Sequence, residues 1–227
     1  MSPFFELGLF VVLVGGFVGF IVWQYKKNQA RKAAMMTFIA SHGYGYIPRA
    51  DDRTRYFRSP PFGQGYSPSA EHVVSGTVRG VPFETFAYQF TTRTRDSKGH
   101  MSTQTHPFQV TWIPLAQALP TMRLRTDNAF LRWGKSLGGR DLDTESEEFN
   151  NQWKVWCEDE RIGHAILTPR MIEMFLKQEV MGRSYVFEGK ALMTYVPGHT
   201  DLTETPSLVS LLADIASLIP PFLMEEP

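Results

Sequence analysis

Residues 134–138, Gly-Lys-Ser-Leu-Gly, match the G-x-S-x-G letters of a nucleophile elbow, in which a serine sits on a turn between a strand and a helix. Gly138 and Gly139 follow Ser136 closely, and two successive glycines disfavour the helix that the elbow requires. The same letters resemble the end of a phosphate-binding loop, but Ala129 stands where that loop needs its first glycine. We therefore expect neither a catalytic Ser136 nor a phosphate-binding loop.

Acidic residues alternate between positions 141 and 147, as they do in a calcium-binding loop. That loop requires Gly where Ser146 stands and a bidentate Glu where Gln152 stands. Thr144 and Glu147 are more simply interpreted as a capping box for a short helical turn. The six histidines include no i, i+4 pair, and the single cysteine, Cys157, cannot form a zinc cluster. The sequence therefore predicts no metal site and no cofactor.

A hydrolase-type site assembled from dispersed residues is the alternative to a non-catalytic protein. Its acid and base residues would come from separate segments, such as His72, Asp159 or His164. Sequence spacing does not exclude it. An enzyme should have a deep pocket with converging polar groups, whereas a binding module should have a shallow face or groove.

An uncharged apolar run from Leu7 to Trp23 precedes all of these residues. As a helix it would be roughly 26 Å long at ~1.5 Å per residue. Extended to residues 4–25 it would reach roughly 33 Å, which is enough to cross a hydrocarbon core of about 30 Å. We therefore expect residues 1–29 to form a membrane anchor.

The charges around this run predict its orientation. Four basic residues follow it within ten positions, whereas only Glu6 precedes it; these basic residues are Lys26, Lys27, Arg31 and Lys32. Basic flanks stay in the cytoplasm, so the N-terminus should lie outside and the rest of the chain inside the plasma membrane. Trp23 and Tyr25 fit the aromatic belt at the lipid interface.

Gly15 and Gly19 form a small-xxx-small pair within the anchor. Such a pair lets a second helix approach closely, which would allow a homodimer or a partner helix. Glycine is also common in membrane helices in general, so both interpretations stay open.

Residues 30–227 have the composition of one globular domain. The whole chain is 43% hydrophobic and 20% charged with no net charge. Residues 1–140 carry 17 Lys and Arg against 7 Asp and Glu, and the excess reverses after residue 140. With zero net charge and no RNA-binding motif, we expect no nucleic-acid partner.

The first part of this domain should contain a helix followed by a β-meander. Apolar spacing predicts a helix over residues 31–42 that ends at Gly43, and a short strand over 44–47. A loop rich in Gly, Pro and Ser, up to residue 70, should pack over its own domain. Alternating patterns then predict three antiparallel strands, at 72–79, 83–92 and 103–113.

The second part of the domain should add strands and helices. Weaker strand patterns occur at 119–125, 152–157 and 164–167, and a hairpin is expected from strands 184–188 and 191–196 with a turn at Gly189 and Lys190. Thr168 should cap a helix whose first residue is Pro169.

The final helix is predicted over residues 206–219, with an apolar face at the helical period. That face contains Leu208, Leu212, Ile215 and Ile219. It packs either on the domain's own sheet, which we favour, or on a membrane or partner, and it is our candidate interaction face. The fold class is thus α+β: an N-terminal transmembrane helix, then an antiparallel β-meander and hairpins packed by two or three helices.

The stretch from Glu148 to Tyr195 contains the pattern E-F-N-x-x-W-x-V-x-x-x-D-x-R-x-x-x-A-I-L-T-P-R-M-I-E-M-F, followed by Phe187-Glu188-Gly189. It resembles a family of bacterial, notably actinobacterial, single-pass membrane proteins classed as a domain of unknown function. The resemblance implies an architecture and no site residue. Together these features predict a membrane-anchored cytoplasmic domain that binds a protein or lipid partner without catalysis.

Overall fold

The structure is a computed structural model that describes residues 23–26, 29, 32–95, 99–126 and 142–225. The chain forms two compact units, residues 1–43 and 44–227. Among the described residues, no helix is both long and apolar enough to cross a membrane. Most of the expected anchor lies outside the described residues, including Leu7, Gly15, Gly19 and Lys27.

The helix over residues 32–42 in the first unit ends as the sequence predicts. Gly43 has a φ of +67°, and its amide donates to the carbonyl oxygen of Ala40 at 3.2 Å. Glycine reaches this left-handed conformation without strain, which closes the helix. Trp23, Tyr25 and Lys26, which precede it in the chain, are also helical.

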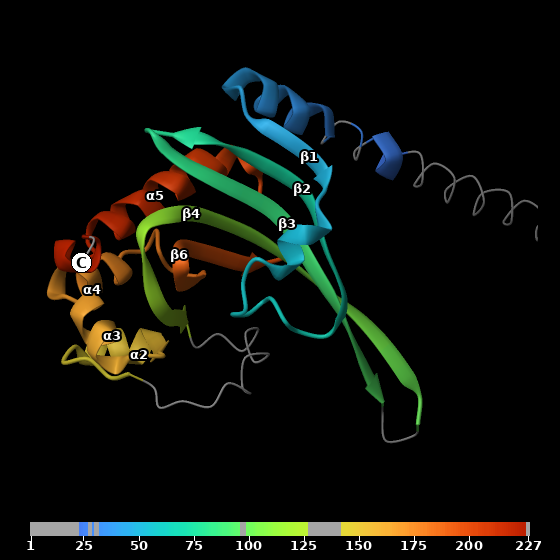
Figure 1. Ribbon diagram of the computed structural model, residues 1–227. Coiled ribbons are helices and arrows are strands. Elements are labelled where there is room, and N and C mark those ends of the chain that lie inside the picture. The colour runs from blue at the N-terminus through green and yellow to red at the C-terminus, as the bar shows by residue number, and fades with distance from the viewer. Residues whose placement is uncertain (1–22, 27–28, 30–31, 96–98, 127–141, 226–227) are drawn as a thin grey trace, which may run out of the picture. The chain divides into compact units, whose positions relative to one another are not determined.

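The second unit contains an antiparallel sheet of six strands in the order β1-β2-β3-β4-β5, with β6 also paired to β4 (Figure 1). The strands are β1 (Gly45–Arg49), β2 (Tyr66–Val78), β3 (Val81–Arg95), β4 (Met101–Thr126), β5 (Trp153–Cys157) and β6 (Ser184–Pro197). The predicted meander is confirmed. Its strands are longer than expected because each is paired over most of its length.

Two predicted strand boundaries are wrong because β4 and β6 continue through them. The pattern at 119–125 is not a separate strand but the second half of β4, and β6 does not turn at Gly189. Instead, Gly189 adopts a φ of +57° and pairs with Leu119 between two register shifts. The irregularities let both strands bend together and stay paired.

Four α-helices are described in the second unit: α2 (Glu147–Gln152), α3 (Glu160–Ile166), α4 (Pro169–Phe175) and α5 (Thr205–Ser217). Short 3-10 turns lie at η1 (Asp51–Arg55), η3 (Leu202–Glu204) and η4 (Pro221–Leu223). The strand predicted at 164–167 is wrong: most of it is the end of α3, which Asp159 caps. The helix beginning after Thr168 is confirmed as α4.

Two apolar clusters lie on opposite faces of the sheet. Alternate residues of β6 enter different clusters, since Tyr185 and Phe187 pack in the first and Val186 in the second. The first cluster is covered by the helices and includes Trp153 and Phe175. The second is covered by the loop over residues 50–65, which confirms that this loop packs on its own domain.

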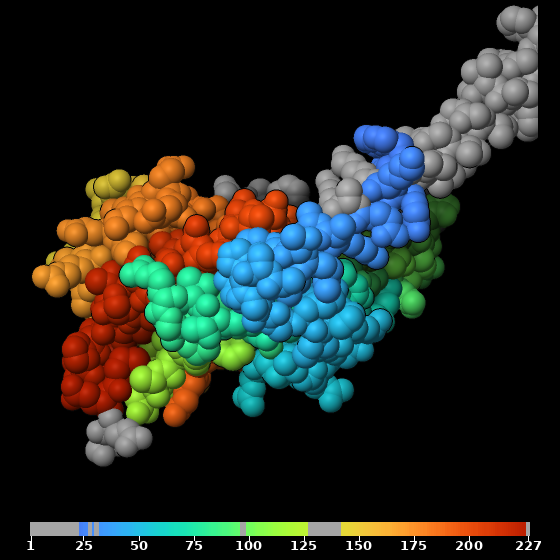
Figure 2. Space-filling view, turned by 90° about the horizontal axis from the view of Figure 1, so that it is seen from above, coloured from blue at the N-terminus to red at the C-terminus, as the bar shows by residue number. Residues whose placement is uncertain are grey.

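Helix α5 contributes its apolar face to the first cluster. Leu212 and Ile215 are fully buried, and Leu208 and Ile219 are less than a tenth exposed. The domain's own core therefore occupies the face that the sequence left open as an interaction surface. Figure 2 shows α5 (red) beside the β2–β3 turn (green), where Arg79 Nη1 lies 3.6 Å from Asp214 Oδ1.

Two polar anchors hold the loop over residues 50–65 on the sheet. The guanidinium group of Arg53 binds both carboxylate oxygens of Glu84 on β3, at 3.3 and 3.0 Å. The carboxylate of Glu188 on β6 accepts the backbone amides of Arg58 and Ser59 at 2.7 and 3.0 Å. Because Glu84 and Glu188 lie on different strands, the loop is fixed at two separate points.

Candidate functional site

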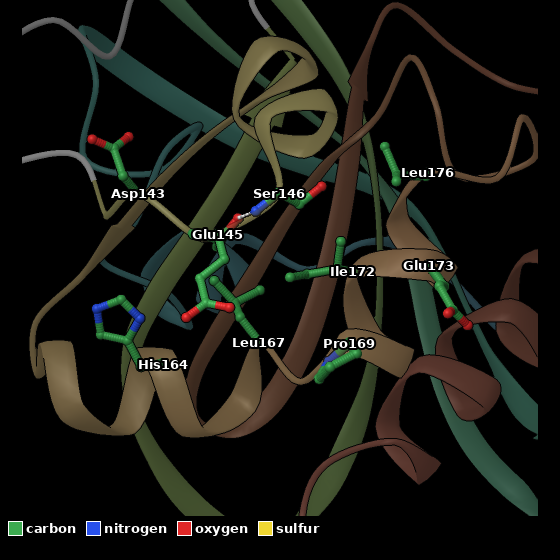
Figure 3. Close-up of a pocket in the computed structure, with 10 residues that line it drawn as sticks. Asp143, Glu145, Ser146, His164, Leu167, Pro169, Ile172, Glu173 and Leu176 are labelled. Carbon is green, nitrogen blue, oxygen red and sulfur yellow. Dashed lines mark hydrogen bonds between the residues drawn. The ribbon is translucent and has the colours of Figure 1, made fainter.

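A pocket of about 740 Å³ lies between the segment before α2 and helices α3 and α4. Ten residues line it: Asp143, Thr144, Glu145, Ser146, His164, Leu167, Pro169, Ile172, Glu173 and Leu176. Figure 3 shows Glu145 and His164 toward one end, Glu173 toward the other, and Leu167 and Ile172 between them. The pocket thus combines an acidic rim with an aliphatic floor.

The segment before α2 is held in place by its own polar contacts. The backbone amide of Leu142 donates to the carbonyl oxygen of Val155 on β5 at 2.8 Å. The amide and hydroxyl of Thr144 both donate to Asn150 Oδ1, at 3.0 and 2.9 Å. The N-cap of α2 is Ser146, whose Oγ accepts the amide of Phe149, so the predicted cap at Thr144 is displaced by two residues.

Helix α3 brings His164 to the pocket. Asp159 begins the helix by accepting the amides of Arg161 and Ile162 at 2.9 and 3.2 Å. Gly163 lets α3 approach β5, because a Cβ atom at this position would lie 3.0 Å from Cys157 Cβ. The close packing of α3 on β5 thus places His164 beside the pocket.

Helix α4 supplies the aliphatic floor. Thr168 caps it with a side-chain oxygen that accepts the amide of Met171 at 3.3 Å. Phe175 is fully buried, and its carbonyl oxygen accepts the indole N–H of Trp153 at 2.9 Å. With one face anchored in the core, α4 presents Ile172 and Glu173 to the pocket.

The chemistry of the lining favours binding. The hydroxyls of Thr144 and Ser146 are engaged by Asn150 and the α2 amide, so neither is paired with His164 as a nucleophile would be. In the part of the chain that the structure describes, no three His, Cys, Asp or Glu side chains are arranged to hold a metal ion. Carboxylates above an aliphatic floor suit a cation carried on an apolar stem.

The residues considered for a dispersed catalytic site are not brought together around this pocket. His164 lines it, whereas Asp159 caps α3. His72 lies on β2, where its Nδ1 is 2.8 Å from the hydroxyl of Tyr46. Ser136 lies outside the described residues, as does Asp141 of the acidic run. The acidic run recognised in the sequence supplies Asp143 and Glu145 to the pocket. The spacing of that run gave no sign that α4 would add Ile172 and Glu173.

The fold and pocket define a mixed α+β domain with a concave acidic site. Residues 112–219, which include β5, β6 and the four α-helices described in the second unit, match a family model described as "Protein of unknown function (DUF3137)". No curated protein sequence matches the chain. Among solved structures, the chain is similar to the mycobacterial trehalose monomycolate transport factor A, TtfA, with a TM-score of 0.59 and 13% identity over 81% of this chain and 93% of that one.

This structural likeness shows a shared fold. The family match agrees with the resemblance to a domain of unknown function that residues 148–195 carry. The actinobacterial and single-pass parts of that resemblance stay predictions.

Proposed function

We propose that the protein is a membrane-anchored, non-enzymatic binding module whose acidic pocket receives a cationic group of a protein or lipid partner. The observation that carries this proposal is the pocket lining, which contains the acidic Asp143, Glu145 and Glu173 together with the aliphatic Leu167, Ile172 and Leu176. A lysine or arginine side chain has the matching chemistry, with a charged head on an apolar stem. The likeness to a transport factor supports a role in binding rather than catalysis.

The uncharged run over residues 7–23 supports the anchoring part of the proposal. We place the N-terminus outside the plasma membrane and residues 30–227 in the cytoplasm, because the basic flank follows the run. Gly15 and Gly19 would allow the anchor to form a homodimer or bind a partner helix.

Photo-crosslinking in native membranes tests the pocket. We expect a crosslinker at Leu176, an uncharged residue of the pocket lining, to give one defined adduct, and a crosslinker at the exposed Lys190 to give none. Glu145→Lys should abolish the Leu176 adduct, since it places a positive charge in the pocket, whereas Glu160→Lys on the exposed start of α3 should not. An adduct that survives Glu145→Lys would refute a cation-binding pocket.

C-terminal reporter fusions test the topology. A fluorescent protein fused after Pro227 should fluoresce, and alkaline phosphatase at the same position should be inactive, because the latter needs an oxidising compartment. Active phosphatase would place residues 30–227 on the outside.

A further inference from the structure

Arg123 and Arg125 form a pair of cations on one face of the sheet, away from the acidic pocket. Arg123 lies opposite Trp156 on β5 and Val186 on β6, and Arg125 lies opposite Lys154. Directly paired residues point to the same side of a sheet. Since Val186 belongs to the second apolar cluster, both arginines lie on the side of that cluster, opposite the helices.

Arg123 stacks on an aromatic ring but lacks the anionic partner that a half-buried cation normally has among the described residues. Its guanidinium carbon lies 3.9 Å from the centre of the Trp156 ring, and its buried Nε has no hydrogen-bond partner. Within the described ranges, neither Arg123 nor Arg125 forms an ion pair. Burial lowers the pKa of Arg123 and the nearby Arg125 adds to the decrease, whereas Tyr195 and Glu188 oppose it. The carboxylate of Glu188 is itself bound to backbone amides of the loop over residues 50–65.

Two buried hydroxyl groups lie beside these arginines. Leu124 on β4 pairs with Tyr185 on β6, so one residue further along the same register Arg125 lies opposite Ser184. The Oγ atom of Ser184 is buried without a hydrogen-bond partner. Tyr195 is 8% exposed. The hydroxyl of Thr194, the residue before Tyr195, donates to the carbonyl oxygen of Ser184 at 2.9 Å, which brings this end of β6 beside Ser184. Burial raises the pKa of Tyr195, and the nearby Ser184, Arg125 and Arg123 oppose that increase.

We propose that Arg123, Arg125, Ser184 and Tyr195 form a binding site for a phosphate group. A half-buried cation without an anionic partner is costly, and a bound anion would reduce that cost. A guanidinium group can bind two oxygens of one phosphate through two parallel N–H donors, and a hydroxyl group can donate to a third oxygen. The phosphate is borne by a lipid headgroup or is free in solution. This site shares no residue with the acidic pocket, so the inference goes beyond the proposed function and does not depend on it.

Thermal unfolding of the full chain in micelles of an uncharged detergent tests the site. A ligand that binds the folded state raises the melting temperature. Sodium phosphate is compared with sodium chloride at equal ionic strength, and dihexanoylphosphatidylglycerol with dihexanoylglycerol, which has no phosphate. We expect one of the two phosphate compounds to raise the melting temperature of the protein. In the Arg123→Gln variant, the concentration of that compound needed for half of the effect should rise about tenfold, which corresponds to the loss of one charged hydrogen bond.

Two variants keep this test decisive. Arg125→Gln should weaken binding in the same way if Arg123→Gln fails to fold, whereas Arg161→Gln, at an exposed arginine on α3, should leave binding unchanged. Stabilisation by sodium phosphate alone identifies a free phosphate, and stabilisation by the phospholipid identifies a headgroup. The inference is overturned if neither compound stabilises the protein, or if the Arg123 and Arg125 variants respond as the parent does.

Discussion

Leu212→Asp is expected to abolish the cooperative unfolding transition of the second unit. Leu212 is fully buried in the first apolar cluster, on the face that α5 turns to the sheet. Truncating a large buried aliphatic side chain typically costs about 2–5 kcal/mol, and burying an unpaired carboxylate adds to this cost. Since a domain's net free energy of unfolding is only about 5–15 kcal/mol, the variant should be largely unfolded.

Circular dichroism during heating of the full chain measures this effect. Ser207→Asp is the matched control, because it adds the same charge to an exposed position in the first turn of α5, where a carboxylate is tolerated. We expect the control to melt at the parent temperature. If Leu212→Asp also melted there, α5 would not be part of the core.

Arg53→Met is expected to lower the free energy of unfolding by about 2 kcal/mol. Glu84 has only 10% of its side chain exposed, and Arg53 binds both of its carboxylate oxygens. This hydrogen bonding is also the main reason that the pKa of Arg53 is raised. Removing the guanidinium leaves a nearly buried carboxylate without its partner, which costs about 3–5 kcal/mol in fully buried pairs and less here, where Arg53 is partly exposed.

A second substitution at Glu84 separates the stranded carboxylate from the other contacts of the Arg53 guanidinium. Glu84→Gln in the Arg53→Met background should recover at least half of the lost stability, because it neutralises the stranded carboxylate. Arg55→Met, at the exposed end of η1, should change the free energy by less than about 0.5 kcal/mol in urea unfolding. A double variant no more stable than Arg53→Met would show that the loss comes from the other contacts of the Arg53 guanidinium, to Asp52 and to the Tyr56 ring.

Local rules decided much of what the sequence predicted. Gly43 ends its helix, Thr168 begins α4, and the alternation in residues 83–92 indicates a strand, because each depends on neighbours only a few residues away. The wrong predictions have the same origin. Gly189 marks a turn in most contexts, but β4 offers a bent partner along the whole of β6, so the strand continues through it.

The sequence by itself determined the helix end at Gly43, the start of α4 after Thr168, the meander, the apolar face of α5 and the uncharged run over residues 7–23. Only the tertiary structure decided which face of the sheet each element covers and which distant residues meet. The pocket joins Glu145 to Glu173, and the register of β4 with β6 brings Ser184 to Arg125. Such contacts are set by strand pairing across long separations, which local periodicity does not encode.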